Sequence, residues 1–191
     1  MANKMNNVEV MVDEHDHNRL MFEGWEREIR SNFDGEKEIN LQLYRDAVDF
    51  VKNYTDGLHH HKEELILFDY MIKHTGNRGA KMVEGMLREH VIGRQMVKQI
   101  VQAIEAFEKE DNSINRLDLL ANSLAYIFYL RKHMIKEDAG VFEFAKQNLP
   151  KDKFDEVEEK SIEWDEDEEN LRKRKYYEEF AENMSKGIYK G

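Results

Sequence analysis

The amino-acid sequence predicts an all-α protein, an up-down-up-down four-helix bundle with an additional C-terminal helix. The composition supports this prediction, because the 191 residues include one proline and ten glycines, the residues that interrupt helices most. Apolar residues recur with the helical period along four long segments joined by short connections. Short connections favour antiparallel neighbours and hence a bundle. No strand-like alternation or hairpin signal competes with this prediction.

Polar and glycine-containing stretches divide the chain into five helical segments. They are predicted at about 5–31, 38–74, 79–110, 114–147 and 151–185. The first ends before Gly35 and the fourth before Pro150, since both residues disfavour a continuing helix. The fifth segment is heavily charged, and its apolar residues are irregularly spaced. We therefore expect a bundle domain at 1–150 and an extension at 151–191 that packs on the bundle or on a partner subunit.

Charge and composition exclude several classes of protein. The net charge of −11 argues against a nucleic-acid partner, because phosphate binding needs a cationic face. No apolar run approaches the roughly 20 residues of a membrane span, and the N-terminus lacks the apolar core of a signal peptide. The absence of cysteine excludes disulfides, thiolate-bound zinc and iron–sulfur clusters. The composition is typical of a soluble, cytoplasmic protein.

Part of the sequence is repeated around histidines. The eleven residues that begin at Met11 return at Met86, where Met, Glu-His, Arg and Met keep their spacing. A His-x-x-x-Glu pair at His59 returns at His133. Four histidines and two carboxylates with approximate two-fold symmetry form the ligand set of a dinuclear metal site. The predicted ligands are His15, His59, Glu63, His90, His133 and Glu137.

Helical periodicity places the repeated His and Glu side chains on inward faces. At about 100° per residue, His59 and Glu63 share one stripe, and His133 and Glu137 share the matching stripe of the fourth helix. His60 projects about 100° away from its stripe. Burying two carboxylates without a cation would be costly. Imidazole with carboxylate suits iron, manganese or zinc.

The pattern leaves other residues near these stripes with weaker or open roles. Glu14 and Glu89 are either acceptors that orient the imidazoles or ordinary surface acids, and the second reading is favoured. Tyr126 and Tyr129 either donate hydrogen bonds to a bound oxygen species or belong to the core. The remaining histidines are expected at the surface or in the core with partners of their own, namely His17, His60, His61 and His74.

These motifs resemble those of the hemerythrin-like HHE cation-binding family, over about residues 8–148. In chain order they are Glu14-His15, His59-His60-His61-Lys62-Glu63-Glu64, Glu89-His90-Val91-Ile92-Gly93-Arg94 and His133-Met134-Ile135-Lys136-Glu137-Asp138. The resemblance implies a non-haem di-iron centre, that is, two iron ions with an oxo or hydroxo bridge and two bridging carboxylates. It implies the same six residues as ligands.

One departure from the family's oxygen carriers bears on function. Those carriers have a His-x-x-x-His motif in the third helix, whose earlier histidine falls on Met86 here. They also place an aspartate where this chain has Asp138, whereas the helical wheel prefers Glu137. With four inward histidines, both irons are expected to keep accessible positions. Reversible oxygen carriage is therefore less expected than sensing, iron handling or redox chemistry.

We expect a non-haem di-iron protein that binds or reacts with dioxygen or a related small molecule such as peroxide or nitric oxide, in oxygen or redox sensing or in iron handling. One alternative is a redox enzyme or an iron donor for the repair of iron–sulfur proteins. Such donors often carry an N-terminal cysteine-bearing domain, which this sequence lacks. A sensor with a separate redox or signalling protein partner is a second possibility, and a structural metal-binding bundle is a third. The sequence leaves open whether the protein is an enzyme and what its oligomeric state is.

Overall fold

A computed structural model describes residues 6–189, and over that range the chain is helical, with no strand. The prediction of an all-helical protein is confirmed. The first rod is α1 (Asn7–Phe33), and the third is α4 (Gly76–Lys109). The second rod is made of α2 (Leu41–Phe50), η1 (Val51–His60), η2 (Glu63–Leu67) and α3 (Phe68–His74), where η denotes π-helix. The fourth is made of α5 (Ser113–Lys136), η3 (Glu137–Val141) and α6 (Phe142–Asn148).

Asparagine caps explain where several of these helices begin. The Asn6 side chain accepts a hydrogen bond from the Glu9 backbone N–H, and the Glu9 carboxylate accepts one from the Asn6 N–H. Asn40 and Asn112 cap α2 and α5 in a similar way. The turn between α3 and α4 is shorter than predicted, because Gly76 adopts a left-handed φ of 65° that reverses the chain at once.

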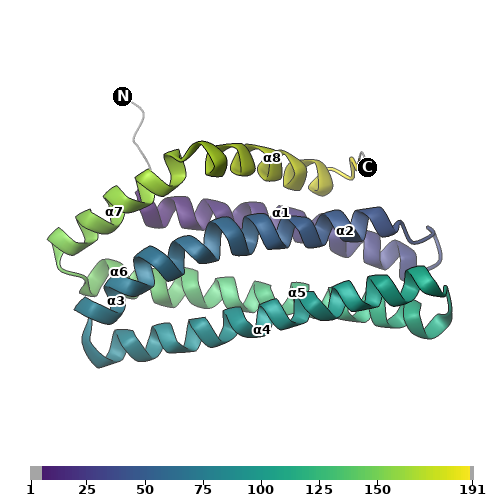
Figure 1. Cartoon of the computed structure of the whole chain (residues 1–191), viewed down its shortest axis with the longest axis horizontal. Coiled ribbons are helices and arrows are strands. Elements are labelled where there is room, and N and C mark those ends of the chain that lie inside the picture. The colour runs from purple at the N-terminus through teal and green to yellow at the C-terminus, as the bar shows by residue number, and fades with distance from the viewer. Residues whose placement is uncertain (1–5, 190–191) are drawn as a thin grey trace.

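The four rods lie alongside one another, and successive connections between the rods lie at alternate ends of the molecule (Figure 1). The second rod contacts both α1 and α4, and α5 contacts α4 and α1. The apolar core is divided into two clusters along the rods. One includes Trp25, Tyr44 and Ile100, and the other includes Phe68 and Phe142. The predicted metal ligands lie at or next to the point in each rod where one cluster gives way to the other, as a polar layer inside the bundle.

The C-terminal extension forms two helices, α7 (Lys151–Glu166) and α8 (Glu168–Ser185), where one was predicted. The break occurs at Asp167, whose extended backbone (ψ 132°) leaves the helix and whose side chain caps α8. α8 packs along α1, as Figure 1 shows. Close approach requires Gly24, because a Cβ there would lie 2.4 Å from the Met184 carbonyl oxygen. The Arg27 guanidinium donates to the same carbonyl at 2.8 Å.

Within residues 6–189, no helix combines the length and apolar character needed to cross a membrane.

Candidate metal centre

The six predicted ligands come together in one buried layer. Each of the four rods supplies one histidine, and the second and fourth rods each add a glutamate. All six residues are at most 1% exposed: His15, His59, Glu63, His90, His133 and Glu137. The imidazoles of His15 and His59 form one pair, with ring centroids 4.4 Å apart. Those of His90 and His133 form a second pair, with centroids 4.9 Å apart.

Glu63 reaches both histidine pairs, with one carboxylate oxygen directed toward each. Its Oε1 lies 3.7 Å from Nε2 of His59, and its Oε2 lies 3.6 Å from Nε2 of His90. A carboxylate with its two oxygens on different imidazole pairs has the arrangement of a bridge between two cations.

Glu137 repeats this arrangement from the opposite side of the layer. Its Oε2 lies 3.3 Å from Nε2 of His15, and its Oε1 lies 2.9 Å from Nε2 of His133. Glu63 and Glu137 are thus related to each other by the same approximate two-fold repeat that relates the histidines.

The atoms that face one another in this layer have no hydrogen-bond partner in the described chain. They are the Nε2 atoms of all four histidines and both carboxylate oxygens of Glu63 and Glu137. Leaving that many buried polar atoms unpaired is costly, so such groups normally bind a partner. Imidazole nitrogens and carboxylate oxygens converging at this spacing suit first-row transition metals such as iron, manganese or zinc. The donor set therefore fits the pair of metal ions that the sequence predicts.

A ring of carboxylates holds the opposite nitrogen of each imidazole. Each Nδ1 donates to a carboxylate from a neighbouring rod. The carboxylate on each rod orients the histidine of the next rod in chain order, and the carboxylate on the fourth rod orients the histidine of the first. The pairs are His59 with Glu14 at 2.7 Å, His90 with Glu64 at 2.7 Å, His133 with Glu89 at 3.0 Å, and His15 with Asp138 at 2.7 Å. A hydrogen-bonded Nδ1–H leaves the Nε2 lone pair free for a metal and fixes the ring orientation.

Each carboxylate of this ring also binds a cation. The pairs are Glu14 with Lys62 at 2.6 Å, Glu89 with Lys136 at 2.6 Å, Glu64 with Arg94 at 2.9 Å, and Asp138 with Arg19. These cationic side chains follow the sequence repeat. In each half of the repeat, one carboxylate binds a lysine and the other binds an arginine. They keep the carboxylates ionised, because an opposite charge favours the charged form.

The protonation of the layer without metal reflects burial and neighbouring charge. Burial and the nearby Glu137 carboxylate raise the pKa of Glu63 well above its usual value. Burial and the neighbouring His15 lower the pKa of His59 to about 4. For His15, burial favours the neutral ring, but the hydrogen bond to Asp138 and the negative charge of the neighbouring Glu137 outweigh it and raise the pKa to about 8. A metal ion would displace these protons.

Glu63 and Glu137 each begin a π-helical segment. Glu63 is the first residue of η2 and Glu137 the first of η3, so the local backbone follows the sequence repeat as well. π-Helical turns inside α-helices occur frequently at functional sites. Here they lie at the polar layer, where side-chain direction matters most.

The structure decides the roles that the sequence left open. Glu14 is fully buried and holds His59, so the favoured reading as a surface acid is wrong for it. Glu89 holds His133 from a half-buried position. Tyr129 donates to the Glu89 backbone carbonyl at 3.1 Å, so its hydroxyl proton already has a partner.

His60 lies in the core with Asp56 as its partner, one of the two places expected for it, but it is closer to the predicted metal-binding face than the helical wheel indicates. The helical wheel turned it away from the metal-binding face, but it is 5% exposed and packs against His90. Two physical reasons explain the difference. η1 is a π-helix, so an α-helical wheel misplaces its residues. The second rod also lies between α1 and α4, so two adjacent positions can both face inward. The run of three histidines was the signal available in the sequence.

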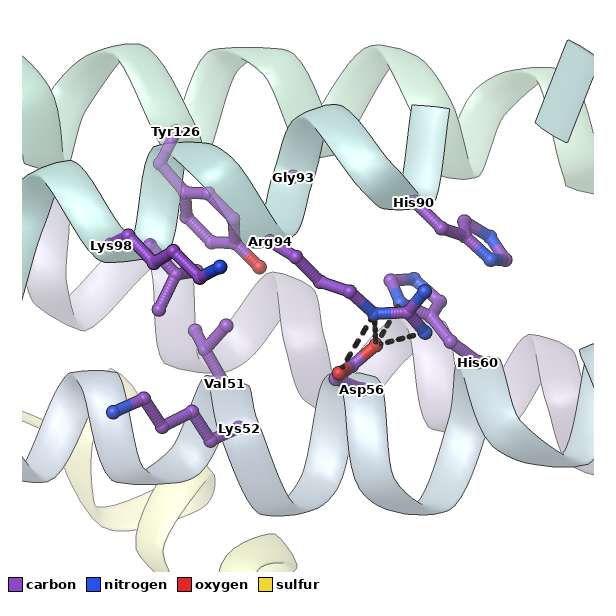
Figure 2. A pocket seen from close by; sticks show the side chains of 10 residues that line it. Val51, Lys52, Asp56, His60, His90, Gly93, Arg94, Lys98 and Tyr126 are labelled. Carbon is purple, nitrogen blue, oxygen red and sulfur yellow. Dashed lines mark hydrogen bonds and ion pairs between the residues drawn. The ribbon is translucent and has the colours of Figure 1, made fainter. Parts of the chain in front are cut away.

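A cavity of about 270 Å³ opens beside this layer. His60, His90 and Arg94 line one end, and Val51 and Tyr126 line the other (Figure 2). Val97 also lines the cavity. Lys52 and Lys98 also belong to its wall. Figure 2 shows the Tyr126 hydroxyl directed into the cavity toward Arg94.

The fold and the layer of donors define a helical-bundle protein with a buried nitrogen- and oxygen-lined cation site. The family model of the hemerythrin HHE cation binding domain matches residues 6–145, and the chain belongs to this family. The match covers the four rods that supply the layer and ends before α7. No curated protein and no solved structure matches the chain.

Proposed function

We propose that this chain binds two iron ions and uses them to bind or react with dioxygen or a related small molecule such as peroxide or nitric oxide. His15 and His59 would hold one ion, and His90 and His133 would hold the other. Glu63 and Glu137 would bridge them. Oxygen or redox sensing, or iron handling, is the biological role that we propose for this reactivity, with a redox or signalling protein as partner.

One observation carries the proposal. Eight buried donor atoms, four Nε2 and four carboxylate oxygens, converge without hydrogen-bond partners in the described chain. The membership in a cation-binding family supports the same reading. An apolar or fully hydrogen-bonded layer would be far more stable in the absence of metal, so the layer is explained best by cations that it holds.

The protein residues would prepare the ions for chemistry by positioning and by excluding water. The carboxylate ring fixes the four imidazoles so that their Nε2 atoms converge, which reduces the reorganisation that binding requires. The apolar clusters above and below the layer keep bulk water out. Two iron ions held by these residues would supply redox chemistry toward an oxygen-containing or nitrogen-containing small ligand.

Metal analysis and rapid mixing test the proposal together. Protein reconstituted with ferrous iron under anaerobic conditions should hold about two irons per chain, as expected for a dinuclear site. Replacing His133 by Ala should remove most of this iron, whereas replacing the exposed His74 should not. An iron content far below two per chain, or equal loss in both variants, would contradict it.

Mixing the reduced protein with dioxygen in a stopped-flow spectrometer separates the possible roles. A stable and reversible new absorption band indicates ligand binding, and a rapid irreversible oxidation indicates redox chemistry. No spectral change with dioxygen, peroxide or nitric oxide would reject reactivity and leave a structural metal site.

A further inference from the structure

The outward face of α5 is apolar over most of the helix. Apolar side chains that are exposed or half-buried follow one another there at intervals of three and four residues, and finally of seven: Ile114, Leu117, Ala121, Leu124, Phe128 and Ile135. The large exposed ones are 45–69% exposed. A surface helix normally turns polar residues toward solvent, and apolar residues at this spacing form the seam along which one helix packs on another. We call this face the α5 seam.

The C-terminal extension leaves the α5 seam open. α7 and α8 pack on the first and second rods, where their main contacts are with α1, α3, η1 and η2. Figure 1 shows them along the upper edge of the bundle, whereas α5 lies with α4 on the lower side. A helix that covers the seam must therefore come from outside the described chain.

A groove beside the seam can receive an aromatic side chain. It has a volume of about 490 Å³, and residues from the end of α1 and the first turns of α5 line it, among them Ile29, Phe33, Leu117 and Ala121. Phe128 projects from the same seam and is 45% exposed. Because Phe128 lies about 10 Å further along the helix than Ala121, it cannot fill this groove in its own chain. Phe128 of a second copy can.

Two side chains of opposite charge lie on the seam at equal distances from its middle. Asp118 is seven residues before Ala125, and Lys132 is seven residues after it. All three are exposed, and within residues 6–189 neither charged side chain forms an ion pair. An antiparallel second copy of α5 would place each Asp118 opposite the other copy's Lys132. A parallel copy would instead place Asp118 against Asp118, and such a meeting of like charges is unfavourable.

We propose that two copies of this chain form a dimer through their α5 seams, which pack antiparallel around a two-fold axis at Ala125. Residues at equal distances before and after Ala125 then lie opposite each other, and the same surface serves both copies. Phe128 of each copy lies next to Ala121 of the other and enters its groove. The small Ala125 side chains meet at the axis and let the helices approach closely. Asp118 and Lys132 balance each other on the seam, although the chain carries a net charge of −11.

Single cysteines test the alignment directly, because the chain has no cysteine of its own. Ala125→Cys places two thiols side by side at the axis, so mild oxidation should give a covalent dimer on a non-reducing gel. Ile114→Cys is the matched control, since its two copies would be roughly 33 Å apart in the antiparallel pair and should stay unlinked. A parallel pair would link both variants and a monomer neither, and either result would overturn the proposal.

Exchange of charges tests the pairing of Asp118 with Lys132. Sedimentation velocity of the full chain should show a dimer for the wild type. Asp118→Lys and Lys132→Asp each bring like charges together at two places in the dimer, so each should raise its Kd at least about ten-fold. The double variant restores opposite charges and should recover the wild-type Kd. A double variant that dimerises no better than the single variants would contradict the pairing.

A charge at Phe128 tests the groove. Phe128→Arg should raise the dimer Kd at least about thirty-fold, as expected for loss of a central aromatic contact. Leu171→Arg on α8 is the matched control, because Leu171 is 48% exposed and lies in the extension, away from the seam. It should leave the Kd unchanged. Both positions are exposed, so circular dichroism should show unchanged helix content. Equal weakening by the two changes, or a wild type that is monomeric, would overturn the proposal.

Discussion

The Nζ atom of Lys62 lies 2.6 Å from Oε1 of Glu14, and neither side chain is more than 1% exposed. The other Glu14 oxygen accepts the hydrogen bond from His59. On the far side, Asp165 of α7 binds Lys62 at 2.9 Å, and Arg174 of α8 binds both Glu14 and Asp165. A chain of buried and part-buried charges therefore connects one imidazole of the candidate metal centre to the C-terminal extension.

Breaking this chain at Lys62 should destabilise the protein strongly. Lys62→Met removes the cation while keeping the volume, and leaves Glu14 buried with less compensation, so unfolding free energy should fall by about 3 kcal/mol. Lys136→Met is the matched control, because Lys136 makes the equivalent bond to Glu89 but is 53% exposed. That change should cost less than about 1 kcal/mol. Urea denaturation of the metal-free proteins measures both, and equal losses would contradict the assignment.

The extension should also affect metal binding without supplying a ligand. Arg174→Leu removes a hydrogen bond to Glu14 and so loosens the carboxylate that orients His59. We expect about ten-fold weaker binding of metal, as is typical when an outer partner of a ligand is lost. Arg172→Leu, two residues earlier and exposed, should have no effect. Competition with a chromophoric chelator gives the affinities, and identical values for the two variants would show that the extension is not coupled to the site.

Metal affinity should rise with pH through the neutral range. Despite its burial, His15 has a pKa of about 8 in the metal-free protein, because Asp138 and Glu137 favour its protonated form. Only the neutral ring binds metal, so this proton opposes binding below about pH 8 and no longer does so above it. Affinity should increase about ten-fold per pH unit from pH 6.5 to 7.5.

Asp138→Asn is the informative variant for this pH dependence. It removes the hydrogen-bonding carboxylate that raises the His15 pKa most, so the region of steep dependence should move to lower pH. A chelator competition series between pH 6 and 9 measures the shift. A wild-type affinity that is flat over this range would refute the argument.

Bound metal should stabilise the fold substantially. Metal at a concentration of about a thousand times its dissociation constant raises the free energy of unfolding by about 4 kcal/mol. For a protein of this size, that corresponds to a rise in Tm of about 8–16 °C. Glu63→Gln should abolish most of this rise, because it removes a charged bridge between the pairs. Calcium, which prefers oxygen ligands alone, should give little stabilisation. Thermal melts monitored by circular dichroism test these expectations.

Much of the architecture followed from the sequence, because it is encoded locally. Helical periodicity, a single proline and short polar connections are enough to specify long helices and their approximate ends. The repeated spacing around His15 and His90 identified the polar layer, because residues four apart on a helix share a face. Helical periodicity did not predict the break at Asp167, where one capping residue divides the predicted fifth helix into two.

Tertiary structure alone decided how these groups are paired. The partners of the imidazoles come from other rods, such as Glu14 for His59 and Asp138 for His15, and no local spacing encodes a contact between residues 45 or 123 positions apart. The position of His60 likewise depended on a π-helical backbone and on the presence of two neighbouring rods. Sequence determined that the repeated His and Glu side chains share one face of each helix, whereas packing determined which other residues are buried with them and which residues meet, because hydrogen bonds and burial between helices arise only once the helices are assembled.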